Sequence, residues 1–420
     1  MTKKILIILI IILILAVVGV FIFYFAFSKN NPNSDQFDGS PLGFIFGSFG
    51  GGGNNLDEDV DNGPDITIGE EKPLLRLRKI SETPTAGFVV FQNEDKEVTV
   101  RYTERSTGHI FEASTVRPTI KRISNTTIPR IYEAVWVNSE ESVMRYLDED
   151  NNIKSFYAKI IKNDADSTEE GKTEGVFLRD NIKDVFLYGK KILNIYNEAG
   201  YSQFVISDVD GSNSFEIYEY PLEGWLIQSP KTGMFALTIK PTYDNFGYLY
   251  FLDINSKEKT KILSKVVGLT TLTSGDANKV LFAEKIKLSS YDVDNKETKK
   301  MDVDTLPEKC AWFNDSISAI CGIPKNTLGG KYPDDWYQGI YSFSDDIYIL
   351  DVDGGFSELI ISPEEFSGEN IDLIKPIFSS DEKFLFFINK KDQSLWSLEI
   401  SPEIKIKTEN IETATTTSEN

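Results

Sequence analysis

The fold is decided by Val-Arg-Tyr at residues 100–102, a short turn, and Ile-Phe-Glu-Ala at residues 110–113. The same arrangement returns 44 positions later, as Met-Arg-Tyr at 144–146, a turn, and Ser-Phe-Tyr-Ala at 155–158. Short runs rich in β-branched and aromatic residues on either side of a turn are typical of antiparallel strands. Their recurrence indicates that one small sheet is used several times along the chain.

Seven such units can be marked between residues 83 and 400, which gives about 45 residues to each. This is the length of a four-stranded propeller blade. No stretch holds a sustained apolar stripe with helical spacing. We therefore expect an all-β fold, a β-propeller of seven four-stranded blades. Six or eight blades are the alternatives, because a charged insertion at 162–182 blurs the third unit. The expected first strands are 88–91, 132–137, 185–188, 225–228, 270–273, 310–313 and 374–378.

A short strand that ends in serine closes several of these units, at residues 121–124, 261–264 and 359–362. The last unit lacks such a strand, but a matching one precedes the first unit at residues 77–81. We expect this early strand to complete the last sheet. The pairing would close the ring and remove open sheet edges, which otherwise invite aggregation.

Two later segments carry a family resemblance. Residues 378–387 (Phe-Ser-Ser-Asp-Glu-Lys-Phe-Leu-Phe-Phe), followed by Ser-Leu-Trp-Ser-Leu at 394–398, resemble the WD40-like repeat of TolB-type propellers. The same repeat type is similar to those in the propeller domain of dipeptidyl peptidase IV. Residues 347–355 resemble the third strand and turn of that repeat. The resemblance implies a propeller over residues 73–401, and the catalytic α/β domain of the peptidases has no counterpart in residues 402–420.

Before the propeller, residues 5–27 form an unbroken apolar run. A helix of this length spans about 34 Å, enough to cross a bilayer. A cleaved signal peptide is the alternative, although its apolar region is normally shorter. Lys3 and Lys4 precede the run, so the positive-inside rule places the N-terminus in the cytoplasm and the rest of the chain outside it.

The expected organisation is therefore that of a single-pass protein of the cell membrane. Residues 1–29 are a transmembrane anchor that contacts the membrane through residues 5–27. Residues 30–72 are rich in glycine and aspartate and are expected to be a flexible stalk. Residues 73–401 are the extracytoplasmic propeller, and residues 402–420 are a disordered tail.

Charge and composition exclude several functions. The chain carries 65 acidic and 44 basic side chains, a formal charge of −21, which disfavours binding to nucleic acid. One histidine and two cysteines cannot assemble a zinc site of several histidines or cysteines. That histidine, His109, follows Thr-Gly in an expected hairpin and is interpreted as structural.

Acidic turns offer the weak candidates for a cofactor, which would be Ca²⁺. Asp208 and Asp210 precede one glycine, and Asp351 and Asp353 precede another. Neither turn has the third oxygen ligand or the distal glutamate of a calcium loop. Asp-Gly is also a favoured hairpin turn. We therefore interpret both as turns and expect no metal or other cofactor.

Cys310 and Cys321 flank an expected hairpin whose loop is 314–317, so the two residues would face each other. Opposed residues on paired strands have Cβ atoms about 5 Å apart, within reach of a disulfide after local adjustment. Outside the cytoplasm a structural disulfide is the favoured interpretation. Two free thiols and a redox pair are the alternatives.

A long insertion at 324–339 in the sixth unit is the candidate binding site. Long loops in compact domains often carry function. Its aromatic and acidic residues would stack on a sugar or clasp a basic peptide; the alternative is that the aromatics pack over their own blade. The candidate ligand-binding residues are Tyr332, Asp334, Asp335, Trp336 and Tyr337.

Arg101 and Arg145 occupy equivalent positions in neighbouring units. Each is expected to pair with a carboxylate between blades, and the alternative is that they grip a ligand carboxylate.

The leading functional hypothesis is a binding module at the bacterial cell envelope that engages a protein or a glycan. No catalytic residues are assigned. One alternative is an extracytoplasmic glycan hydrolase or lyase that uses two carboxylates, whose separation a sequence does not reveal. The other is a structural component of an envelope assembly, in which the stalk sets the reach.

Overall fold

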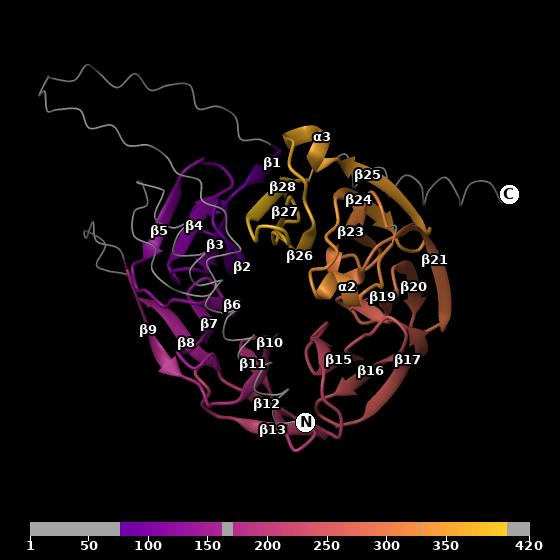
Figure 1. Ribbon diagram of the computed structural model, residues 1–420, viewed down its shortest axis with the longest axis horizontal. Coiled ribbons are helices and arrows are strands. Elements are labelled where there is room, and N and C mark those ends of the chain that lie inside the picture. The colour runs from indigo at the N-terminus through magenta and orange to yellow at the C-terminus, as the bar shows by residue number, and fades with distance from the viewer. Residues whose placement is uncertain (1–75, 162–170, 328, 401–420) are drawn as a thin grey trace, which may run out of the picture. The chain divides into compact units, whose positions relative to one another are not determined.

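Seven four-stranded antiparallel sheets form a closed ring in the computed structural model, which describes residues 76–161, 171–327 and 329–400 (Figure 1). This confirms the expected all-β, seven-bladed propeller. The expected membrane span at 5–27, the stalk and the tail lie outside the described residues. Within the described residues, no helix has both the length and the apolar character that a membrane crossing needs.

Blades 1 to 4 each use four consecutive strands, and the first strand of each blade matches its predicted position. Blade 1 contains β2 (Thr85–Gln92), β3 (Val98–Glu104), β4 (Ile110–Ser114) and β5 (Ile120–Ser124). Blade 2 contains β6 (Ile131–Trp136), β7 (Glu141–Leu147), β8 (Ile153–Ile161) and β9 (Lys172–Phe177). Blade 3 contains β10 (Ile182–Tyr188), β11 (Lys191–Glu198), β12 (Tyr201–Ser207) and β13 (Phe215–Tyr220). Blade 4 contains β14 (Trp225–Gln228), β15 (Met234–Ile239), β16 (Phe246–Asp253) and β17 (Lys259–Val267).

Blades 5 to 7 add three short helices, and blade 7 borrows a strand from the start of the propeller. Blade 5 contains β18 (Thr270–Thr273), β19 (Lys279–Glu284), β20 (Lys287–Asp292) and β21 (Glu297–Asp304), and η1 (Pro307–Lys309) follows it. Blade 6 contains β22 (Cys310–Trp312), β23 (Ser318–Pro324), α2 (Asp334–Tyr337), β24 (Asp345–Asp351) and β25 (Phe356–Ile361), and α3 (Pro363–Ser367) follows it. Blade 7 contains β26 (Leu373–Phe378), β27 (Phe384–Asn389), β28 (Leu395–Glu399) and β1 (Leu77–Lys79).

The second strands of the blades supply much of the core, because both of their faces are covered. Every residue of β23 is buried, and so are five of the six residues of β27. Such strands have runs of apolar residues rather than alternation. The fourth strands lie at the rim, and β5 exposes three of its five residues. This gradient places the apolar clusters between neighbouring sheets.

The ring is closed by β1, which pairs antiparallel with β28 (Figure 1). Leu77 faces Leu398 and Lys79 faces Trp396 in this register. The Leu77 side chain is 1% exposed and lies in the cluster between blades 6 and 7. This pairing confirms the prediction that the strand at residues 77–81 completes the last sheet, and the paired strand itself spans Leu77–Lys79.

Arg101 and Arg145 both contact the neighbouring blade, and the expected pairing with a carboxylate between blades is found for Arg145, whereas Arg101 pairs with a carboxylate of its own blade. The Nε atom of Arg101 lies 2.6 Å from Oε2 of Glu112 in its own blade, and its Nη1 donates to the carbonyl of Ser139 in blade 2. Arg145 lies 3.6 Å from Asp184 of blade 3 and also donates to the Lys183 carbonyl. Both side chains are nearly fully buried, and each links its own blade to the next one.

Substitution of Leu77 by alanine tests how much the closing strand matters. Removal of a fully buried leucine side chain typically costs about 2–5 kcal/mol. We expect Leu77→Ala to lower the free energy of unfolding by about 3 kcal/mol, as measured by urea denaturation of the full chain. The matched control is Leu359→Ala, because Leu359 is 49% exposed on the rim strand β25. Equal losses in the two variants would contradict a special role for the closure.

Candidate functional site

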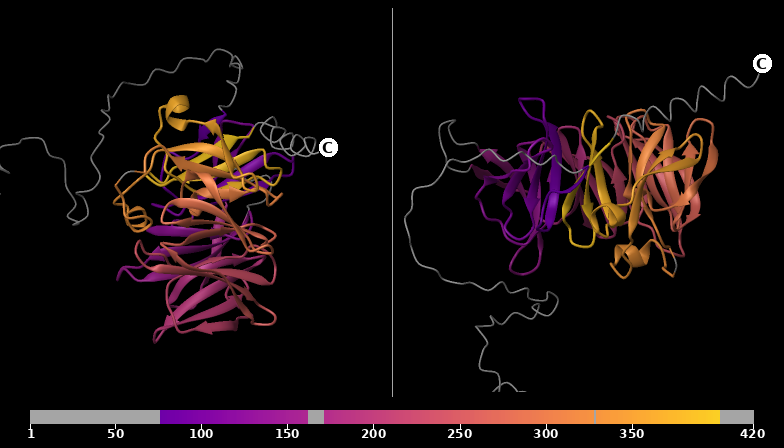
Figure 2. Two further views of the ribbon diagram at one scale, coloured as in Figure 1. Left: turned by 90° about the vertical axis from the view of Figure 1, so that its right-hand side faces the viewer. Right: turned by 90° about the horizontal axis from the view of Figure 1, so that it is seen from above.

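One face of the propeller carries the insertion of blade 6. In an antiparallel sheet the connections from the second to the third strand open on the same face as those from one blade to the next. The described residues between β23 and β24, here called the insertion, therefore lie on the face that also carries η1 and α3. Figure 2 shows α2 standing out from this side of the disc. We call it the insertion face.

The aromatic residues of the insertion point inward. Tyr332 and Trp336 are only 4% and 3% exposed. Both rings pack against Phe343, with ring centroids 5.2 Å and 6.3 Å apart. Tyr337 is partly buried, and its hydroxyl donates to the Glu308 carboxylate. In this conformation Tyr332 and Trp336 belong to the packing of the insertion and offer no open ring to a sugar.

A fully buried lysine lies beneath these rings. The side chains of Lys309, Asp345 and Asp372 are all 0% exposed. The Lys309 ammonium lies 2.6 Å from Oδ2 of Asp345, pairs with Asp372, and donates to the Leu373 carbonyl at 3.2 Å. These contacts satisfy all three ammonium protons, which a charge removed from water requires.

Asp372 connects this lysine to the insertion. Its carboxylate accepts hydrogen bonds from the Trp336 indole at 3.0 Å, the Ser342 hydroxyl at 3.1 Å and the Phe343 backbone N–H at 2.9 Å. Asp372 directly precedes β26 of blade 7. The insertion of blade 6 is therefore fastened to the neighbouring blade by one carboxylate.

The two aspartates of the insertion also have structural partners. Oδ1 of Asp334 accepts the backbone N–H of Tyr243 at 3.1 Å, so the insertion reaches past blade 5 to blade 4. Oδ2 of Asp335 accepts the backbone N–H of Lys331 at 2.7 Å. Lys390 of blade 7 lies over the Trp336 ring, 5.1 Å from its centroid, and burial lowers the pKa of this lysine. The insertion is thus contacted by blade 4 and by blade 7.

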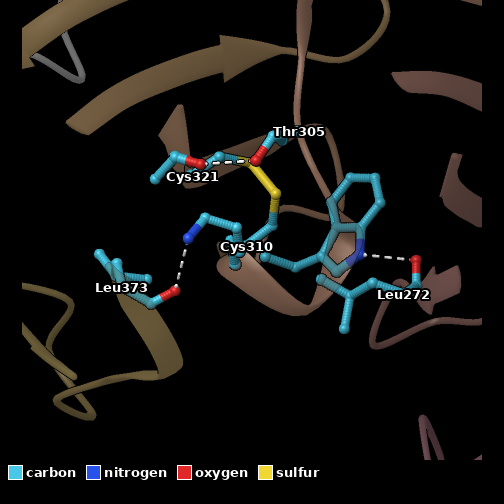
Figure 3. The surroundings of a disulfide bond; sticks show 8 residues. Leu272, Thr305, Cys310, Cys321 and Leu373 are labelled. Atoms are coloured by element: carbon cyan, nitrogen blue, oxygen red, sulfur yellow. Dashed lines mark hydrogen bonds between the residues drawn. A yellow bond between two sulfur atoms is a disulfide. The ribbon is translucent and has the colours of Figure 1, made fainter. Parts of the chain in front are cut away.

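Cys310 and Cys321 form a disulfide within the first hairpin of blade 6, at paired positions of β22 and β23. Figure 3 shows the bond between Thr305 on one side and Leu373 on the other. The Thr305 hydroxyl donates to the Gly322 carbonyl at 2.6 Å. Disulfides persist mainly in oxidising compartments, so this bond points to a location outside the cytoplasm.

The acidic turns that were candidates for Ca²⁺ have protein partners instead. Asp208 pairs with Lys191, and Asp353 pairs with Lys279. Asp210 accepts the Ser212 hydroxyl, and hydrogen bonds from Ser212 hold the pKa of its carboxyl low. Oδ1 of Asp351 accepts the backbone N–H at position 354. Among the described ranges, no cluster of three or more histidine, cysteine or acidic residues is arranged to hold a metal ion.

Sequence reasoning missed Lys309, Asp345 and Asp372. They lie far apart in the chain, and each stands beside an apolar run, where an isolated charge looks like ordinary surface. The available signal was their position, because each lies at the start of a strand or immediately before one, close in sequence to buried apolar residues. A charge at such a place needs a partner.

The comparisons with known proteins found similar solved structures but no matching family. No family model and no curated protein matches the chain. The propeller domain of the Trilobed protease from Pyrococcus furiosus is 14% identical, with 76% of this chain and 96% of that one covered and a TM-score of 0.46. TolB from Acinetobacter baumannii is 12% identical, with 74% and 78% covered and a TM-score of 0.38.

The tricorn protease is also similar, at 14% identity and a TM-score of 0.36. The match covers 72% of this chain and 33% of the tricorn chain, so this protein spans about a third of that protease. At these identities the likeness concerns the propeller fold alone.

Lys309→Met removes the cation from two buried carboxylates. Loss of one partner from a buried ion pair costs about 3–5 kcal/mol, because the remaining charge is left uncompensated. We expect a fall of that size in the free energy of unfolding, together with faster proteolysis of the insertion. Lys287→Met is the control, because the Lys287–Asp304 pair is largely exposed and worth less than about 1 kcal/mol. A loss no greater than that of the control would contradict the anchoring role of Lys309.

Asp345 gives this network a dependence on pH. Burial raises the pKa of Asp345 to about 6, against the opposing effect of Lys309. A carboxyl whose pKa is higher in the folded than in the unfolded state stabilises the fold below its unfolded pKa. That contribution is lost as the pH rises through the folded value. Lowering the pH from about 7.5 to about 5 should therefore add about 1 kcal/mol to wild-type stability relative to Asp345→Asn. Urea unfolding of both proteins measures this difference, and a difference independent of pH would contradict the assignment.

Proposed function

We propose that this protein is a membrane-anchored extracytoplasmic propeller that binds a protein partner on its insertion face. The apolar run at 5–27 supports the anchor, and the disulfide supports the compartment. The single observation that carries the binding role is the construction of the insertion. Its base is fixed by buried ionic contacts, while its tip is left in solvent.

The tip of the insertion consists of Gln338, Gly339 and Ile340, all of which are exposed. The Ile340 side chain is 65% exposed, the second most exposed of the large hydrophobic side chains in the described parts of the chain. An apolar side chain on a rigid support loses little conformational entropy when it enters a partner's pocket. A few such anchors supply much of the affinity of an interface. Ile340 is therefore the expected anchor.

The charge of the protein defines the chemistry of the partner. With a formal charge of −21, the protein attracts basic surfaces and repels acidic ones at long range. Complementary charge mainly speeds association, and contacts at the tip then hold the complex. We therefore infer a protein partner with a basic surface around an apolar pocket.

Ile340→Asp tests this proposal in the full chain on living cells. Proteins cross-linked to the wild type are identified by mass spectrometry, and recovery is compared with Ile120→Asp. Ile120 is 45% exposed on the rim strand β5 of blade 1, so this control introduces the same charge on a distant surface. We expect one dominant basic partner whose recovery falls at least about tenfold with Ile340→Asp alone.

Equal recovery from both variants, or no enriched protein from the wild type, would overturn the proposal. In the second case the purified chain is tested on carbohydrate arrays. A glycan bound there would replace the protein partner as the ligand.

A further inference from the structure

A cavity of about 430 Å³ lies between blades 3 and 4. One side of it is formed by Phe186 of β10, and another by Trp225 and Leu226 of β14. Trp225 begins its strand, and Lys183 is the second residue of β10, so the cavity lies toward the insertion face. The loop after Lys240 leads to Tyr243, which contacts the insertion. The cavity is thus close to the insertion but separate from its tip.

Two exposed lysines line this cavity, and both act electrostatically on Asp184 in the same lining. Lys183 and Lys240 are both exposed, and neither ammonium lies within 4 Å of a carboxylate or makes a hydrogen bond in the described part of the chain. The carboxylates of the cavity already have partners. Asp184 lies 3.6 Å from Arg145, and Glu223 accepts the Asn197 amide at 3.2 Å. Two exposed ammonium groups beside an apolar wall, neither within 4 Å of a carboxylate in the described part of the chain, are a place where an anion can bind.

The surroundings favour an anion with a single charge. Asp184 and Glu223 lie in the same cavity and balance the two lysines, so a doubly charged phosphate would meet more repulsion than a carboxylate. The apolar wall next to Lys183 and Lys240 suits a hydrocarbon or aromatic group. Ligand pockets commonly combine such a wall with a few charged groups that fix orientation.

We propose that this cavity binds a carboxylate that carries an apolar group. Lys183 and Lys240 donate charge-assisted hydrogen bonds to the carboxylate. Phe186 and Trp225 pack against the apolar group. A free small acid and the C-terminus of a polypeptide present the same chemistry. The inference does not depend on the insertion acting as a docking element.

The test uses the full chain in detergent micelles, with empty micelles as blank, and ligand-observed NMR. The small probes are N-acetyl-phenylalanine and its amide. The peptide probes are Gly-Ser-Gly-Phe with a free and with an amidated C-terminus. We expect the acids to bind at least about tenfold more tightly than the amides, because only the acids form charge-assisted contacts. Added salt should weaken the binding of the acids and leave the binding of the amides unchanged.

Three variants locate the site. Lys183→Met and Lys240→Met should each weaken acid binding at least about fivefold. Lys261→Met removes the same charge from the rim strand β17 of blade 4 and should leave binding unchanged. Urea midpoints equal to that of the wild type show that the variants are folded. If both acids bind equally well, the cavity recognises the carboxylate and its apolar group in either source. If only the peptide acid binds, the ligand is the C-terminus of a polypeptide.

Failure of both acids to bind, equal binding of acids and amides, or an equal loss in Lys261→Met would overturn this inference. None of these results depends on Ile340, so the outcome of this test is independent of the outcome of the cross-linking experiment.

Discussion

The hydrogen bonds between β1 and β28 are the constraint on which the rest of the propeller depends. Each blade buries its two faces against its neighbours, so the arrangement is complete only when the last blade meets the first. Three strands of blade 7 come from the end of the propeller and the fourth from its start. Leu77 pairs with β28 through its backbone, and its side chain packs between blades 6 and 7.

The buried network at Lys309 shows how a propeller carries a long insertion without leaving it loose. The insertion has little regular structure, only the single turn of α2. Its order comes from Asp372, which accepts hydrogen bonds from three of its residues, and from Lys309, which neutralises Asp372. An ionic group is costly to bury, but it imposes a geometry that apolar contacts alone leave open. Because the base of the insertion is fixed in this way, the position of the tip with Ile340 is fixed as well.

Most of the fold could be predicted from the sequence, and much of the site could not. The blade count, the first strands and the early closing strand follow from local patterns of apolar residues and turns, which repeat seven times. The facing positions of Cys310 and Cys321 follow from a short loop. By contrast, the inward orientation of Trp336 depends on Asp372, which is 36 residues away in the chain, and Lys309 is 63 residues from Asp372. Local patterns do not reveal contacts between residues so far apart, so the sequence left open whether the aromatic residues of the insertion bind a ligand or pack over their own blade.

The closing strand has a consequence for biosynthesis. β1 leaves the ribosome before every other propeller strand, and its partner β28 leaves last. Throughout synthesis, the edge of the first strand therefore stays unpaired, while each of the six intervening blades is built from strands that are consecutive in the chain. Contacts between such distant segments form slowly and leave incomplete chains prone to aggregation. A chain truncated anywhere before residue 395 lacks the strand that pairs with β1, so the ring closes only after the last propeller strand has been made.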